Sequence, residues 1–335
     1  MDNLWISLLL RSRGDVWLMK RGRFDGTGEG PPNRPEITVE IQAPTHTPGE
    51  AGLDWVLDAF DVYEGRYRRD AVDAAVFHRE AITPRLIAVL DRVLIDPETY
   101  LEGDHYAHVY AVMLLGYFRE RSAHEKIVAV CGLPGHLPER LFGDAVTEDL
   151  PAILYETSGG SLDLVRQLAA REDADPYYRL AALSAMVYAA LDGLADRREV
   201  LRFIASMIEP PAPSDTDFCS LAAIRALHLY PAEVMVTIER AFADGRIAPF
   251  VVSPEDFRDA LADGEAATLA RSRRRMAQCM PGDIHARMSW WAAFGDDQAA
   301  PVRPADPSGR PGNSAAEKKR KRQQQRASRR RNRRR

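Results

Sequence analysis

The fold is decided by the stretch Asp175-Pro176-Tyr177-Tyr178-Arg179-Leu180-Ala181-Ala182-Leu183. We expect it to open a helix that spans residues 177–191. The spacing of its Asp, its Arg and its second Ala recurs at Asp104, His108 and Ala111, where histidine replaces arginine. A looser third copy starts at Asp217. The copies lie 71 and 42 residues apart, which fits two repeats and one repeat of about 40 residues.

Residues 175–183 resemble the second half of a HEAT repeat. In HEAT repeats an aspartate caps the helix, an arginine four residues later faces a neighbouring repeat, and small residues permit close helix contact. The resemblance implies structural, repeat-contact roles for Asp104, His108, Asp175 and Arg179. An irregular helical bundle is the alternative arrangement.

Helical periodicity begins near Gly52 and continues to about Phe294. Its first stripe has apolar residues at the spacing i, i+3, i+4 and i+7, as on one face of a helix. We expect Thr83 to cap the next helix, with Pro84 in its first turn, and Asp96-Pro97 to end it. Further helices are expected near residues 104–118, 123–130, 137–141, 150–155, 162–168, 200–208, 221–230 and 234–242. Strand-like runs are confined to 37–41 and 250–252, so we predict an all-α fold.

The chain divides into four predicted parts. Residues 1–51 hold many Gly and Pro residues and should form a flexible leader. Residues 52–295 are expected to form a HEAT-like α-solenoid. Residues 296–317 are a Pro-rich linker, and 318–335 are a basic tail. Both terminal extensions are predicted to be disordered.

A family resemblance is carried by three segments between Asp61 and Ser158. These segments are Ile82-Thr83-Pro84-Arg85-Leu86-Ile87, Ala107-His108-Val109-Tyr110-Ala111-Val112-Met113-Leu114-Leu115-Gly116 and Asp149-Leu150-Pro151-Ala152-Ile153-Leu154. They resemble the bacterial DUF1186 family, and the likeness extends to about Phe242. The resemblance implies a helical, repeat-like fold and supplies no activity. Some relatives end in a Cys-rich zinc tail of the SecA translocation ATPase type, but this chain has no cysteine after Cys279.

The charge is distributed unevenly. The 335 residues include 45 Lys plus Arg and 49 Asp plus Glu, a net charge of −4. Twelve of the basic residues lie in 318–335, so residues 1–317 carry a net charge of −16, all of it within 50–298. This excludes a uniformly basic nucleic-acid-binding domain and a wholly disordered acidic protein.

The basic tail is the predicted polyanion-binding segment. Its cations are Lys318, Lys319, Arg320, Lys321, Arg322, Arg326, Arg329, Arg330, Arg331, Arg333, Arg334 and Arg335. Such a segment binds phosphates electrostatically and with strong salt dependence. It has no aromatic residue for stacking on single strands. RNA, ribosomes, DNA and anionic membrane surfaces are candidate partners, and a tail that solubilises or self-associates is the alternative.

Metal and catalytic motifs are weak. His105 and His108 share a helix face at i, i+3, beside Glu102 and Asp104, but without a His-Glu-x-x-His or Cys-x-x-Cys pattern. We therefore expect no metal, no cofactor and no catalytic residue. A metal-dependent enzyme using His105 and His108 remains a third hypothesis.

The sequence predicts a non-enzymatic protein-interaction scaffold or adaptor, with an unknown protein partner on the helical surface. Three scattered cysteines suit a reducing compartment, so we expect it in the cytoplasm. No apolar run reaches the length of a membrane span. The alternative is a nucleic-acid-associated protein, including a HEAT-like enzyme that processes nucleic acid. That alternative requires a cationic helical face, whereas the array is acidic outside a basic cluster at Arg271–Arg275.

Overall fold

Helices make up all the regular structure in the part of the chain that the computed structural model describes, which is residues 52–62, 66–102, 105–210, 215–280 and 282–289. Isolated bridges join Val62 to His105, and Pro134 and Gly135 to Ala174. The prediction of an all-α fold is confirmed. The α-helices are α2 (Asp54–Asp61), α3 (Arg69–Phe77), α4 (Arg79–Ile95), α5 (Pro97–Glu102), α6 (Ala107–Tyr117), α7 (His124–Cys131), α8 (Leu137–Thr157), α9 (Asp163–Ala170), α10 (Pro176–Leu191), α11 (Arg197–Ser206), α12 (Thr216–Leu227), α13 (Met235–Ala243), α14 (Pro254–Asp263), α15 (Glu265–Cys279) and α16 (Ile284–Met288), with 3-10 turns η2 (Arg121–Ala123) and η3 (Ala232–Val234).

Two helices, α6 and α10, are apolar on nearly every side. Ten of the eleven residues of α6 and thirteen of the sixteen residues of α10 are buried. A helix without a polar face must lie inside the core, because each of its apolar sides is stabilised only when other helices cover it and exclude water. Both helices pack against α8, which therefore lies between them in the core.

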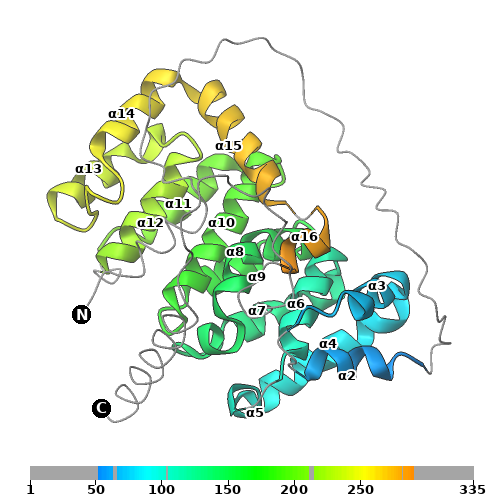
Figure 1. The fold of residues 1–335 in the computed structure, drawn as a ribbon. Helices are drawn as coiled ribbons and strands as arrows, with labels where there is room; N and C mark the ends of the chain where they lie inside the picture. The colour runs from blue at the N-terminus through cyan, green and yellow to red at the C-terminus, as the bar shows by residue number, and fades with distance from the viewer. Residues whose placement is uncertain (1–51, 63–65, 103–104, 211–214, 281, 290–335) are drawn as a thin grey trace, which may run out of the picture. The chain divides into compact units, whose positions relative to one another are not determined.

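Alternate helices along the chain pack side by side. α6 contacts α8, α8 contacts α10, α10 contacts α12, and α12 contacts α14. The helices between them contact this series, and some contact one another. For example, α7 contacts α9, and α11 contacts η3. Figure 1 shows the sequence of helices passing from α2 and α3 through α6, α8 and α10 to α13 and α14.

The last two helices leave this order. α15 packs on both α14 and α10, and Arg273 Nε donates a 2.8 Å hydrogen bond to the Leu191 carbonyl at the end of α10. α16 then lies near α6 and α8 (orange in Figure 1), and its His285 reaches Asp73 of α3, 212 residues earlier. The C-terminal helices therefore fold back along the helical array.

Helix α4 corrects one sequence prediction. It begins at Arg79, so Thr83 and Pro84 lie inside it, and the Thr83 hydroxyl donates to the Arg79 carbonyl. Starting the helix earlier places Ile82 in the core, where it is fully buried. Proline leaves the carbonyl of Glu80 without its helical donor, but Glu80 is exposed and its carbonyl can bond water.

Three other boundaries differ from expectation. The segments 137–141 and 150–155 belong to one element, α8, which bends at Gly143 because this residue has a φ of 59°. α6 begins at Ala107, and its N-cap is Tyr106. The sequence had predicted Asp104 as this N-cap, and Asp104 lies outside the described residues. Residues 250–252 form a turn and a bend.

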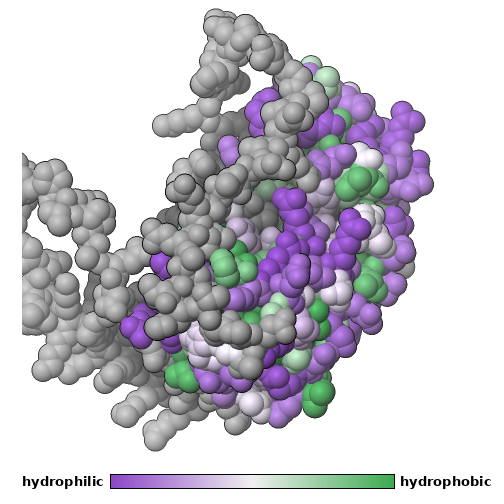
Figure 2. Space-filling model, turned by 90° about the vertical axis from the view of Figure 1, so that its right-hand side faces the viewer, coloured by the Kyte–Doolittle hydropathy of each residue, from purple (hydrophilic) through white to green (hydrophobic). Residues whose placement is uncertain are grey.

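Several predictions fall on residues that the structure does not describe. These are the leader 1–51, the linker 296–317 and the tail 318–335. Among the described helices, none combines the length and apolarity needed to cross a membrane. The face in Figure 2 is mostly hydrophilic where it is coloured, with hydrophobic residues scattered among polar ones.

The approach of α6 to α8 gives a test of the packing. A methyl group added at Gly116 would lie 2.6 Å from Ile153 Cγ1. We expect Gly116→Ala to lower the free energy of unfolding by about 1–3 kcal/mol, because a packed core cannot absorb extra volume. Chemical denaturation measures this change.

Gly282→Ala is the matched control, because an added methyl group there meets no atom within 4 Å. Ile153→Ala removes the clashing atoms, so in that background Gly116→Ala should lower the free energy of unfolding much less. Equal costs in both backgrounds would show that the two helices do not meet as described.

Candidate functional site

Asp175 and Arg179 stabilise the start of the buried helix α10. Asp175 is its N-cap, and its Oδ1 accepts a 2.9 Å hydrogen bond from the Tyr177 backbone N–H. Arg179 Nε donates to the Ala169 carbonyl of α9 at 3.0 Å, and its guanidinium carbon lies 4.3 Å from the centre of the Phe218 ring of α12. Burial lowers the pKa of Arg179. This arginine therefore joins three helices.

His108 joins α6 to α8. Its Nε2–H donates a 2.6 Å hydrogen bond to the Leu141 carbonyl, and its ring lies beside Tyr100 and Phe142. The side chain is buried, and burial lowers its pKa to about 4. His105 is held elsewhere, with Nδ1 3.1 Å from Asp61 Oδ1. The two histidines proposed as metal ligands are thus engaged with different partners.

Three other residues come together as a set of potential metal ligands, which we call the His136 cluster: His136, Glu139 and Asp175. One ligand-type atom from each lies within 4.8 Å of the others. His136 Nδ1 is 2.9 Å from Asp175 Oδ2 and 3.6 Å from Glu139 Oε2. The cluster forms where the start of α8 meets the start of α10.

Backbone and side-chain bonds hold these two helix starts together. Gly135 N–H donates to the Asp173 carbonyl at 2.9 Å, beside the bridge between Gly135 and Ala174. The buried hydroxyl of Tyr178 donates to the Pro138 carbonyl at 2.8 Å. His136 and Asp175 are therefore fixed relative to each other by contacts on both sides.

The surroundings of the His136 cluster are acidic. Asp215 caps the neighbouring helix α12, as Asp175 caps α10. The pKa of Tyr177, which follows Asp175 by two residues, is raised by burial first and then by the charges of Asp217, Asp175, Glu139 and Asp215. This end of the helical array therefore favours cations.

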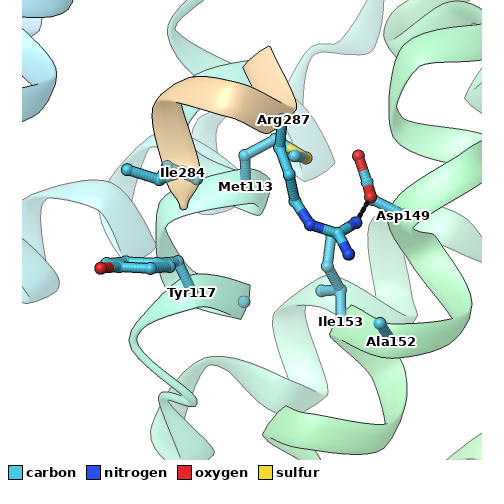
Figure 3. Close-up of a pocket in the computed structure, with 8 residues that line it drawn as sticks. Met113, Tyr117, Asp149, Ala152, Ile153, Ile284 and Arg287 are labelled. Atoms are coloured by element: carbon cyan, nitrogen blue, oxygen red, sulfur yellow. Dashed lines mark ion pairs between the residues drawn. The ribbon is translucent and has the colours of Figure 1, made fainter. Parts of the chain in front are cut away.

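A crevice between α6, α8 and α16 is shown in Figure 3. Arg287 of α16 forms an ion pair with Asp149 of α8, and its Nη2 donates to the Cys279 carbonyl at 2.5 Å. Apolar residues line the rest, among them Met113, Ile153 and Ile284. The charged groups of the crevice are thus engaged with each other and hold α16 in place.

His285 provides a second anchor for α16. Its Nδ1 lies 2.8 Å from the Tyr67 hydroxyl, and its Nε2 lies 2.9 Å from Asp73 Oδ1. The ring is buried and meets the Tyr67 ring edge to face. Together with Arg287, this histidine attaches the last described helix to both α3 and α8.

The basic cluster Arg271–Arg275 lies on α15 and is partly used in internal contacts. Arg271 forms an ion pair with Asp263 at 2.8 Å, and Arg273 donates to the Leu191 carbonyl. Arg274 and Arg275 are exposed. The predicted polyanion ligands, all within 318–335, lie outside the described residues.

Sequence reasoning missed the His136 cluster. Its local signal is His136-x-x-Glu139, a spacing that places two ligand types on one helix face. The third member, Asp175, is 39 residues from His136, and its helix-start pattern pointed to capping. The bridge between residues 134–135 and 174, which no local pattern predicts, brings the three together.

These observations define an all-α protein built from serially packed helices, with buried polar contacts at the helix starts. Comparison with known sequences gives the family. The family described as "Protein of unknown function (DUF1186)" matches residues 52–295, and the chain belongs to it. The match begins at Gly52, the first described residue.

Two relatives come from chlamydiae, and both are uncharacterized proteins. The protein from Chlamydia trachomatis serovar D is 30% identical over 200 residues, which cover 58% of this chain and 78% of the relative. The protein from Chlamydia muridarum is 28% identical over 198 residues, with coverage of 58% and 79%. No solved structure matches this chain significantly.

The buried state of His108 predicts a pH dependence. Its pKa is about 4 in the folded chain, below the ordinary value of 6.5, so the unfolded chain binds the proton more readily. The contribution of His108 to stability is complete above pH 6.5 and is lost as pH falls toward 4. From the shift we expect a loss of about 3 kcal/mol over this range.

Denaturant titrations from pH 7 to pH 4 measure this effect. His108→Gln keeps a donor for the Leu141 carbonyl and does not titrate, so it should flatten the pH dependence by about that amount. The same slope in wild type and His108→Gln would contradict the assignment.

Proposed function

We propose that the protein is a non-enzymatic interaction scaffold in the cytoplasm. Residues 52–295 bind a protein partner through their helical surface, and the tail 318–335 binds a polyanion. The observation that carries the proposal is the separation of charge, with −16 on residues 50–298 and +12 on 318–335. Two modules of opposite charge suit two partners of different chemistry.

The order of helix contacts supports a HEAT-like solenoid as the form of the array. Alternate helices from α6 to α14 pack in sequence, as expected when each repeat contacts its neighbours. Arg179 lies on α10 and reaches α9 and α12, in keeping with the arginine that faces the neighbouring repeat in HEAT proteins. Solenoids expose extended surfaces that bind other proteins.

The free cysteines support the cytoplasmic assignment. Cys131 and Cys219 are buried, Cys279 is partly buried, and none of the three forms a disulfide. Burial raises the pKa of both Cys131 and Cys219, which disfavours the reactive thiolate. Structural thiols of this kind suit a reducing compartment.

The competing proposal is a protein that acts on nucleic acid through a cationic helical face. The main basic cluster of the array is on α15, and two of its arginines already bind Asp263 and the Leu191 carbonyl. The acidic surroundings of the His136 cluster would repel phosphates. We therefore assign polyanion binding to the tail rather than to the array.

Deleting residues 318–335 tests this assignment. We expect the full chain to bind a 20-nucleotide RNA or a 20-base-pair DNA with little sequence preference. Its affinity should fall by at least about 100-fold between 50 and 200 mM salt if most tail cations contact phosphates. The shortened chain should lose this salt-dependent binding, as measured by fluorescence anisotropy.

A matched control changes Arg274 and Arg275 of α15 to Ala and keeps the tail. This variant should bind as the wild type does. If the deletion leaves binding unchanged and the α15 variant loses it, the array is the polyanion site and the proposal is wrong.

A pull-down with the full and the shortened chain, each with and without nuclease, tests the scaffold role. A protein partner of the array should be retained by both chains and should survive nuclease treatment. If every captured protein is lost on nuclease treatment, the array has no direct partner among them.

A further inference from the structure

We propose that the His136 cluster, formed by His136, Glu139 and Asp175, binds a divalent transition-metal cation such as Zn²⁺. This inference goes beyond the scaffold function and does not depend on it. It rests on the geometry of the three side chains, on the charge of Asp175 and on the contacts that hold the cluster in place.

The spacing of the ligand atoms suits one metal ion. Zn²⁺ binds histidine nitrogen and carboxylate oxygen at about 2.0–2.2 Å, so tetrahedral ligands lie about 3.3–3.6 Å from each other. His136 Nδ1 lies 2.9 Å from Asp175 Oδ2 and 3.6 Å from Glu139 Oε2, and all three atoms lie within 4.8 Å of one another. Small side-chain rotations would bring them onto one ion.

The charge of Asp175 favours a cation at this site. Its side chain is 1% exposed, and a buried carboxylate is costly unless a positive charge compensates it. Two other carboxylates with little exposure have arginine partners, since Asp149 pairs with Arg287 and Glu156 with Arg119. In the described part of the chain, the ion-pair partner of Asp175 is the imidazole of His136, which is charged only when protonated.

A divalent cation would supply this charge, with the imidazole nitrogen binding the metal in its neutral form. It would also neutralise Glu139 in the same site. The metal would thus compensate the negative charge of Asp175, as arginine compensates the charges of Asp149 and Glu156.

The structure also preorganises the buried ligand. Asp175 Oδ1 accepts the hydrogen bond from Tyr177 N–H, which fixes the carboxylate and directs Oδ2 toward His136. The bonds from Gly135 to Asp173 and from Tyr178 to Pro138 hold the two helix starts at this distance. Such outer contacts orient metal ligands and raise affinity.

The outer two ligands are accessible to solvent. The side chains of His136 and Glu139 are 74% and 54% exposed, so a cation can enter from solution. Three protein ligands would leave a fourth position for water or for a group from a binding partner. The site would therefore be an open one on the surface of the array.

Zinc titration of the full-length chain tests the proposal. The protein is first stripped with a chelator and then titrated with ZnCl₂ by isothermal calorimetry at pH 7.5. We expect one Zn²⁺ per chain at this site. His136→Ala, Glu139→Gln and Asp175→Asn should each weaken binding at least tenfold, and Mn²⁺ should bind more weakly than Zn²⁺.

His105→Ala is the matched control, because His105 also pairs with a carboxylate, that of Asp61, and belongs to no group of three potential metal ligands among the described residues. It should bind Zn²⁺ as tightly as wild type. Asparagine at position 175 can still cap α10, and Glu139 is exposed, so the metal-free Asp175→Asn and Glu139→Gln variants should keep the wild-type unfolding midpoint. If Asp175→Asn unfolds, the other two variants decide the question.

Two results would overturn the proposal. One is the absence of stoichiometric Zn²⁺ binding to the stripped wild-type chain. The other is wild-type affinity in both His136→Ala and Glu139→Gln, which would place the zinc elsewhere, for example at Cys279. Neither result bears on polyanion binding, so this test and the tail-deletion test fail independently.

Discussion

The burial of α10 is the constraint on which the other contacts depend. A helix covered by α8, α9, α11, α12 and α15 has no exposed side on which to place its polar groups. The polar residues at its start must therefore find partners inside the protein, because an unpaired buried group costs about 1–3 kcal/mol. Asp175 accepts a hydrogen bond from the Tyr177 N–H, and Arg179 donates one to the Ala169 carbonyl. The same residues therefore pair the polar groups at the start of α10 and join this helix to its neighbours.

The fold was largely predictable because its determinants are local. Apolar spacing predicted α2, α4 and the helices from α6 to α13, whereas α3, α5, α14, α15 and α16 had no separate prediction. The start of α4 was not predictable from Pro84, because the tertiary burial of Ile82 outweighs the preference of proline for the first turn. The return of α15 and α16 was also missed, since the bond between His285 and Asp73 spans 212 residues and leaves no periodic signal.

The candidate sites also divide into features that local sequence predicts and features that depend on tertiary contacts. The roles of Asp175 and Arg179 came from a repeat resemblance, and the structure shows the helix cap and the interhelical contacts around them. His105 and His108 looked like a pair in sequence, but burial directs His108 to the Leu141 carbonyl. The His136 cluster combines a helix start with a residue from the following helical pair, so it exists only once the array has folded. Under our proposals, the acidic array binds a cation and a protein partner, and the basic tail binds a polyanion.

The central claim is that the array and the tail are separate binding modules. Photo-crosslinking of the full chain to an RNA that carries 4-thiouridine, followed by mass spectrometry of the attached peptides, tests it directly. The account predicts crosslinks in residues 318–335 and not on the helices between 52 and 289. Crosslinks concentrated on α15 and the helices beside it, with the tail unmodified, would contradict it.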